Sequence, residues 1–216
     1  MRIVVSGVGT EVGKTWTSTA LTLWLRANGK HCIALKPVQS GGAGDSHELA
    51  EASGFHVEPS PYWFQEPIGP HLAARRAKMT IDLEHCRKWV DRCSLGFEVT
   101  IVELAGGLFS PLSDQHTNAD LLKILLPDRW IAVAVDRLGV LHDLSALLMA
   151  AHATALCEPT VVLCAPPSPD GSTGTNGDEL ETVGICRVAA SFPRAQPSSP
   201  EAQEMVKRLV VALGLL

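Results

Sequence analysis

The feature that most restricts the fold of this chain is a glycine-rich loop near its start that ends in Gly-Lys-Thr. The apolar run Arg2–Ser6 predicts a buried strand and Lys14–Ala27 predicts a helix, so the loop joins a strand to a helix. Unpaired N–H groups at the start of a helix attract anions, and the loop's glycines allow backbone to approach them closely. Lys14 would neutralise the β and γ phosphates, and Thr15 would offer its hydroxyl to Mg²⁺. We therefore expect a P-loop, although Val8 stands where the usual pattern has its first glycine.

Short apolar runs alternate with helical patterns along the rest of the chain. The further predicted strands are Cys32–Lys36, Val99–Glu103, Trp130–Asp136 and Thr160–Cys164. The further predicted helices are Asp45–Ala52, Thr80–Cys93, Leu141–Ala155 and Glu201–Leu213. Strands that are apolar throughout are buried on both faces, which favours a mostly parallel sheet flanked by helices. We expect one doubly wound α/β domain over residues 1–216, with ligands at the carboxyl ends of its strands.

Three segments fit this alternation poorly. Gly54–Lys78 is long and interrupted by prolines, and loops of that length tend to be functional or irregular. Ala165–Gly177 is rich in proline, serine and glycine, and we expect it to lack fixed structure. Gly184–Ser191 could form a last strand.

Composition restricts the class of protein and its partners. The formal net charge of −5 disfavours a protein that coats nucleic acid or an anionic membrane. The six cysteines form no CxxC pair, and Cys32, Cys164 and Cys186 sit in apolar runs typical of buried free thiols. No apolar stretch approaches the ~18 residues of a membrane helix, and the N-terminus lacks the apolar length of a signal peptide. We expect a cytoplasmic protein that binds small molecules.

Charged residues follow several of the predicted strands, where ligands of such a sheet bind. Lys36, fixed by the proline after it, is either an ordinary exposed lysine or a contact for a phosphate or anionic substrate. Glu103 precedes two glycines and suits Mg²⁺, which prefers oxygen ligands. Asp45 is either a second metal ligand or a plain helix cap. The start of the helix after Asp136 could hold an anion or only water. His71 has no metal-ligand spacing with the other histidines.

These residues together resemble the dethiobiotin synthetase family of P-loop NTPases. The matching motifs, in order over about residues 1–145, are Gly7–Thr15, Lys36–Gly41, Asp45, Glu66–His71, Val102–Gly107 with Pro111-Leu112, and Leu138–Asp143. The resemblance implies an ATP-dependent enzyme that turns 7,8-diaminopelargonate and CO₂ into dethiobiotin through a phosphorylated carbamate. It also implies a homodimer with substrate at the subunit interface.

The resemblance assigns a role to each matching position. Lys14 and Lys36 neutralise the phosphates and the carbamate, and Thr10 and Ser40 complete the set of expected catalytic residues. Nucleotide contacts fall on Gly9, Thr10, Glu11, Val12, Gly13, Lys14, Thr15, Glu103, Gly106 and Gly107. Substrate contacts fall on Glu11, Lys36, Ser40 and, from the partner subunit, the amides of Gly139, Val140 and Leu141. The expected metal ligands are Thr15, Asp45 and Glu103.

The chain departs from the family pattern at three places. Leu104 replaces a glycine beside the expected metal ligand, and His142-Asp143 replaces Asn-His near the expected carboxylate site. Cys164-Ala165 stands where the family has an asparagine that reads adenine. A thiol lacks the paired donor and acceptor of an amide, so we expect relaxed base selectivity.

Two other functions are compatible with a phosphate-binding loop. One is a switch ATPase of the chromosome-partitioning or nitrogenase-iron-protein class, but those loops carry an extra lysine near their start, which this loop lacks. The other is a nucleotide-binding paralogue without turnover, which the departures at Leu104 and His142 would suit.

Overall fold

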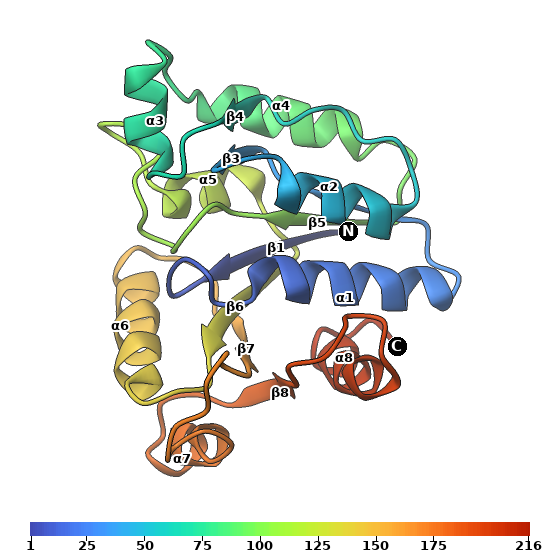
Figure 1. Cartoon of the computed structure of the whole chain (residues 1–216), viewed down its shortest axis with the longest axis vertical. Coiled ribbons are helices and arrows are strands. Elements are labelled where there is room, and N and C mark those ends of the chain that lie inside the picture. Colours follow the sequence, from blue (N-terminus) through green and yellow to red (C-terminus); the bar gives the residue numbers. More distant parts are fainter.

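The computed structural model describes residues 1–216 and is built around a six-stranded parallel sheet (Figure 1). Its strands are β1 (Arg2–Gly7), β2 (Cys32–Leu35), β5 (Val99–Glu103), β6 (Arg129–Val135), β7 (Thr160–Cys164) and β8 (Val188–Phe192). They lie in the order β2-β5-β1-β6-β7-β8, and every neighbouring pair is parallel. The predicted doubly wound sheet is confirmed. The chain extends from β1 first to one side and later to the other, which opens a crevice at the carboxyl end of β1.

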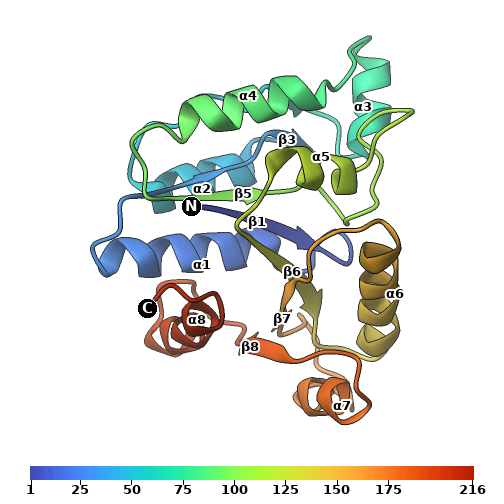
Figure 2. The same cartoon turned by 180° about the vertical axis from the view of Figure 1, so that it is seen from behind.

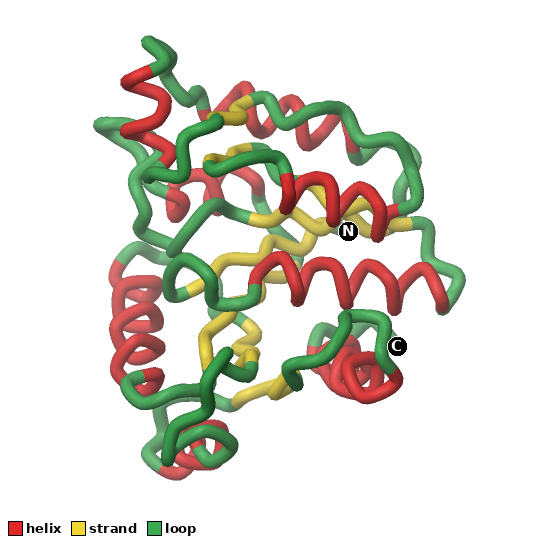
Figure 3. The backbone as a smooth tube through the Cα atoms, in the orientation of Figure 1, coloured by secondary structure: helices red, strands yellow, loops and turns green.

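Helices cover both faces of the sheet, as Figures 1 and 2 show from opposite sides. The helices on one face are α1 (Lys14–Ala27), α2 (Gly44–Ser53) and α8 (Pro200–Ala212). Those whose buried side chains join the other core are α3 (Pro70–Arg76), α4 (Leu83–Cys93), α5 (Asn118–Leu125), α6 (Val140–Ala153) and α7 (Asn176–Thr182). Figure 3 shows the strands as a layer between them. None of these helices has the length and apolar character needed to cross a bilayer.

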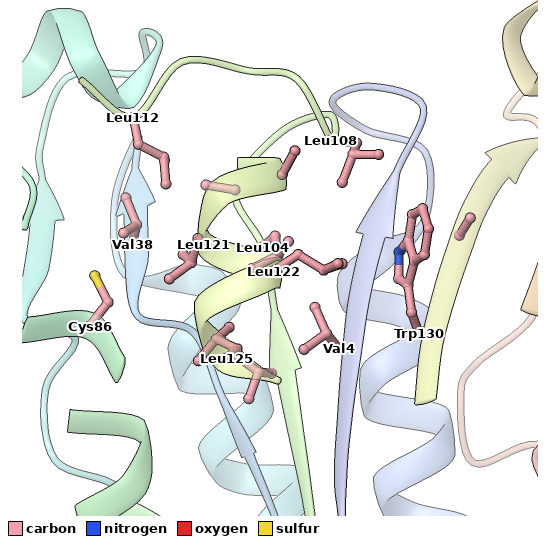
Figure 4. Packing of buried hydrophobic residues seen from close by; sticks show 14 of the residues in the cluster. Val4, Val38, Cys86, Leu104, Leu108, Leu112, Leu121, Leu122, Leu125 and Trp130 are labelled. Carbon is pink, nitrogen blue, oxygen red and sulfur yellow. The ribbon is translucent and has the colours of Figure 1, made fainter. Parts of the chain in front are cut away.

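Each central strand supplies side chains to both cores. In β1, Ile3 and Val5 belong to one core and Val4 to the other, as the two-residue period of a strand requires. Val4 packs in the region that also holds Trp130 of β6 (Figure 4), whose indole N–H donates to Ser6 Oγ at 2.7 Å. Continuous apolar runs are therefore the sequence pattern of strands buried on both faces.

Most predicted boundaries shift by one to three residues, and the shifts have local causes. β2 ends at Leu35, one residue before the predicted end, so Lys36 lies beyond the strand. α4 begins at Leu83 rather than Thr80, because the Asp82 carboxylate caps it by accepting from Glu84 N at 2.9 Å. The helix-cap interpretation of Asp45 is wrong, since α2 begins at Gly44 and Asp45 lies in its first turn.

Several elements do not follow from apolar periodicity. A second, two-stranded sheet pairs β3 (Val38–Ser40) with β4 (Tyr62–Phe64), and β4 and α3 both lie in the segment Gly54–Lys78. The helix α5 is also absent from the predictions; it begins at a Thr117–Asp120 capping box. The expected last strand is present, shifted to β8.

The expectation that Ala165–Gly177 lacks fixed structure is wrong. The buried Asp136 carboxylate, at the end of β6, accepts from Gly174 N at 2.8 Å and from Asn176 Nδ2 at 2.7 Å. Asp170 accepts from Leu138 N at 2.8 Å. These bonds tie the segment to the loop that leads into α6, and the helix α7 begins at its end. The sequence signal was misleading because the partners lie over 30 residues apart.

Candidate active site

The phosphate loop occupies the crevice at the end of β1, and two of its glycines are required by packing. A Cβ on Gly13 would lie 2.5 Å from Cys164 Sγ, and its φ of +98° favours glycine as well. A Cβ on Gly7 would lie 2.5 Å from Val12 Cγ2. Gly9 has neither a positive φ nor a close neighbour, so the conformational argument does not apply to it. Gly7 and Gly13 are therefore needed for the loop to pack against its neighbours, as well as for the backbone to approach an anion.

Lys14 begins α1 and folds back over the loop. Its Nζ donates to Gly9 O at 2.7 Å, and only 6% of the residue is exposed. Burial lowers the pKa of Lys14 to about 8, with the nearby Glu103 carboxylate partly opposing this and the Lys36 charge adding to it. A buried lysine with its charge only partly compensated is suited to receive an anionic phosphate.

Lys36 joins two carboxylates directly across from the loop. Its Nζ lies 2.6 Å from Glu103 Oε1 and also bonds Asp45 Oδ2, so both acids face one point. Burial acts to lower the pKa of Lys36, but the charges of Glu103 and Asp45 outweigh it and raise the pKa above its usual value. Lys36 therefore stays charged, and the interpretation of it as an ordinary exposed lysine is wrong.

Glu103 is fully buried and links this ion pair to the phosphate helix. Thr15 Oγ1 donates to Glu103 Oε1 at 2.9 Å, while Glu103 Oε2 is buried without any hydrogen-bond partner. A buried carboxylate oxygen with no donor lacks the compensation that such groups normally have. The oxygens of Thr15, Asp45 and Glu103 thus form a set that fits a hard cation such as Mg²⁺, with Lys36 as the present counter-charge. The site contains two carboxylates, and no group of three or more His, Cys, Asp or Glu side chains that could hold a metal ion occurs anywhere in the structure.

These groups open into one cavity of about 680 Å³. The expected site residues along its wall are Thr10, Glu11, Val12, Gly13, Lys14, Thr15, Lys36, Ser40, Asp45, Glu103 and Gly106. Its wall also contains residues for which no role was predicted, among them Trp16, Gln39, Ser110 and the turn Pro67–Pro70 before His71. The structure therefore collects, in one space, residues from four separate stretches of the chain, 10–16, 36–45, 67–71 and 103–111.

Gly9 and Gly107 lie behind this wall rather than on it. A Cβ on Gly107 would lie 3.2 Å from Val8 O and 3.3 Å from Gly9 Cα, so the two loops pack backbone against backbone. Gly106 has a φ of +73°, and a Cβ at this position would point toward Thr10 and Ser110. The glycines after Glu103 therefore permit close packing against the phosphate loop.

Comparison with known proteins identifies the family. Residues 1–202 match a family described as AAA domain. An ATP-dependent dethiobiotin synthetase of Caulobacter vibrioides is 33% identical, covering 74% of this chain and 78% of the relative. That of Anaeromyxobacter dehalogenans is 33% identical, covering 88% and 89%. The chain belongs to the dethiobiotin synthetase family. The fold also resembles the MinC:MinD cell division complex of Aquifex aeolicus, with a TM-score of 0.63 at 14% identity over 99% and 96% of the two chains, a level that indicates shared fold alone.

Within this family, the substitution at Leu104 leaves the site intact. The Leu104 side chain is 1% exposed and points into the core near Leu122 (Figure 4). It therefore occupies no space in the cavity beside Glu103. The hypothesis of a nucleotide-binding paralogue without turnover rested on the departures at Leu104 and His142. Leu104 no longer supports it.

A second cavity, of about 700 Å³, continues from the first past Gly13 and Trp16. Its floor includes Cys164, whose thiol lies 3.6 Å from Thr17 Oγ1 and under Gly13, so the side chain packs against the phosphate loop. Burial raises the pKa of Cys164 to about 11, so it stays a neutral thiol. The opposite wall is the loop Pro193–Pro197.

Trp16 holds that loop in place, a role that could not be predicted from the sequence. Its indole N–H donates to Ala195 O at 2.7 Å, and its ring lies 4.9 Å from that of Phe192. The partners are nearly 180 positions away, so no local pattern could have revealed the contact. Trp16 thereby joins the phosphate helix to the far wall of the second cavity.

Gly139, Val140 and Leu141 do not reach the main cavity of this chain. Gly139, with a φ of +96°, precedes α6, and Val140 is buried as the first helical residue. His142 and Asp143 line a separate hollow of about 610 Å³ between α6 and Phe109. A second subunit would be needed to bring such amides to a substrate in the main cavity.

Proposed function

We propose that this chain acts as an ATP-dependent dethiobiotin synthetase, closing the ureido ring of 7,8-diaminopelargonate with CO₂ and a nucleoside triphosphate. The observation that carries the proposal is Lys36, which joins Glu103 and Asp45 in the same cavity as Lys14. Two cations and two acids at the mouth of a phosphate loop suit a reaction that brings together a triphosphate and an anionic carbamate. The relatives named above support the same activity.

The chemistry proceeds by phosphoryl transfer and then ring closure. A carbamate oxygen attacks the γ phosphorus, the bond from that phosphorus to the β–γ bridging oxygen breaks, and the nucleoside diphosphate leaves, while Lys14 neutralises the β and γ oxygens. Lys36 neutralises the carbamate, and Thr10, Glu11 and Ser40 line the substrate side of the cavity. The second amine then displaces phosphate. Because the protein adds little covalent chemistry, positioning and charge supply most of the acceleration.

Thr15, Asp45 and Glu103 would hold Mg²⁺ in this proposal, consistent with the unpartnered Glu103 Oε2. When bound, such an ion neutralises phosphate charge and orients oxygens for in-line transfer. Lys36 would then have to move from the acids toward the substrate. Its long flexible stem allows this without any backbone change.

We further propose that two chains pair through the surface around α6. Leu138 and Met149 are 75% and 73% exposed, and Phe109 is 40% exposed beside the hollow next to α6. Large exposed side chains grouped in this way are typical of protein interfaces. Pairing there would let the Gly139–Leu141 amides of one subunit hold the substrate carboxylate of the other. Light scattering should then give twice the chain mass.

One assay tests the proposal directly. Purified protein is mixed with diaminopelargonate, bicarbonate and Mg-nucleotide, and dethiobiotin is measured by mass spectrometry. We expect dethiobiotin in stoichiometric balance with released phosphate, and neither product without diaminopelargonate. Phosphate release without dethiobiotin, whichever nucleotide is used, would instead indicate an ATPase.

A further inference from the structure

The second cavity adjoins the main cavity at the start of α1. Gly13 and Trp16 lie on the walls of both cavities. A triphosphate held by Lys14 and Thr15 can therefore extend from the main cavity into the second one with the rest of its nucleotide. The charged residues of the second cavity are all exposed, and its walls include the neutral Cys164 thiol and three prolines. A largely uncharged space of about 700 Å³ suits the flat face of a base.

The loop Pro193–Pro197, which forms the far wall of the second cavity, is attached at both ends to the rest of the fold. Ala165 N donates at 2.9 Å to the carbonyl just before the loop, and Gln203 Nε2 donates at 2.5 Å to the carbonyl of its last residue. Between these points, the indole N–H of Trp16 provides the only hydrogen bond from outside this C-terminal segment, to Ala195 O at 2.7 Å. One side chain of α1 therefore positions the middle of the loop.

The Trp16 ring is itself fixed by packing on one side. Its centroid lies 4.9 Å from that of Phe192, with the two planes tilted by 48°. Phe192 is buried at the end of β8, so it provides a rigid support. Trp16 is only partly buried, and it contributes to the walls of both cavities. The side chain can therefore hold the loop and still face a ligand.

We propose that the nucleotide base lies in the second cavity and that Trp16 is a positioning residue for it. Trp16 directly follows Thr15, so the helix that binds the phosphates also sets the position of the wall against which the base rests. A nucleoside triphosphate spans both points, whereas inorganic triphosphate reaches only the first. A wall positioned in advance lowers the ordering cost of binding, so Trp16 adds to the affinity for nucleotide alone. The inference rests on the proposed function and gives it a determinant of nucleotide affinity.

The test separates the base from the phosphates. Trp16→Phe keeps an aromatic ring beside Phe192 but removes the N–H that bonds Ala195 O. Calorimetry with Mg²⁺ should show ATP binding about fivefold more weakly, as for the loss of one hydrogen bond, and inorganic triphosphate binding unchanged. The KM for ATP should rise by the same factor at unchanged kcat. The matched control is Trp24→Phe, on the same helix but outside both cavities, which should change neither ligand's affinity.

A second measurement uses the unmodified protein. ATP should change the tryptophan fluorescence more than inorganic triphosphate does, because only ATP reaches the cavity beyond Trp16. Trp16→Phe should remove that difference, and Trp24→Phe should keep it. This comparison still decides the inference if Trp16→Phe does not fold, since equal changes with the two ligands in the unmodified protein would overturn it.

The binding results divide in the same way. Equal weakening of ATP and triphosphate binding in Trp16→Phe would contradict the inference, because it marks a distortion of the phosphate loop, and so would an unchanged affinity for ATP. A protein that binds neither ligand overturns both the inference and the proposed function. A protein that binds ATP with the expected dependence on Trp16 but makes no dethiobiotin contradicts the proposed function alone.

Discussion

The phosphate cavity and the second cavity meet at Gly13 and Trp16, yet they are built in different ways. The phosphate cavity is surrounded by buried charge, with Lys14, Lys36 and Glu103 each less than a tenth exposed. The second cavity has the Cys164 thiol and the backbone of a proline-rich loop on its walls. A phosphate requires charges at fixed positions, so we expect substitutions there to disable the site. In the proposal above, the second cavity holds the nucleotide base. A flat base can be held by the shape of a cavity and by main-chain groups, and many different side chains permit this.

The largest effect should follow removal of the buried cation of the phosphate cavity. We expect Lys14→Ala to lower nucleotide-dependent dethiobiotin formation by about a thousandfold or more, equivalent to ~4 kcal/mol, because the β and γ phosphates lose their fixed positive charge. Steady-state kinetics measures this. The exposed Lys30, changed to Ala, is the matched control. Near-normal turnover in Lys14→Ala would contradict the catalytic assignment.

The next effect concerns the fully buried acid. Glu103→Gln keeps the shape of the side chain but removes its charge, so we expect a fall of about a hundredfold in kcat, or ~2.7 kcal/mol. The Mg²⁺ concentration for half-maximal rate should rise, as a titration with Mg²⁺ would show. Thermal stability should fall too, because Lys36 keeps only Asp45 as partner. Glu204→Gln, on the exposed side of α8, serves as control; an unchanged Mg²⁺ requirement in Glu103→Gln would remove this residue from the metal site.

The pH dependence of nucleotide binding tests the buried lysine in another way. The pKa of Lys14 is lowered to about 8, chiefly by burial, whereas a bound phosphate favours its charged form. Affinity should therefore fall by up to about tenfold per pH unit above about pH 8, as calorimetry at several pH values can measure. Lys14→Arg, whose guanidinium stays charged, should show a flatter profile.

The lowered pKa of Lys14 also affects the stability of the protein without nucleotide. Below about pH 8 the folded protein must bury a charged Lys14, and above the lysine's usual pKa neither state is charged. The free energy of unfolding should therefore rise as pH increases from about 8 toward 10.5. Lys14→Met should lose this contribution, and a parallel rise in that variant would assign it to another group.

The smallest effect should come from the nucleotide base. We expect ATP, GTP, CTP and UTP to support dethiobiotin formation within about tenfold of one another, or ~1.4 kcal/mol, because Cys164 packs under Gly13 instead of offering an amide to the base. Comparison of kcat/KM for the four nucleotides measures it. A strong preference for ATP would show that another group, such as the Pro193–Pro197 backbone, reads adenine.

The sequence determined the sheet and the phosphate loop because both depend on local order. Apolar runs indicate strands buried on both faces, and a strand, a glycine loop and Lys-Thr at a helix start form one continuous segment. The positions of Lys36 and Glu103 after their strands could also be predicted, since parallel strands bring their carboxyl ends to one edge.

Only the tertiary structure decided which of these residues meet and what surrounds them. In the folded protein, Asp45 bonds Lys36 and does not cap a helix. Leu104 packs in the core, and Cys164 lies beneath Gly13. The fold also ties Trp16 to Ala195. Each contact joins segments distant in the chain, and its energy depends on distance and burial in three dimensions, which residue order alone does not contain.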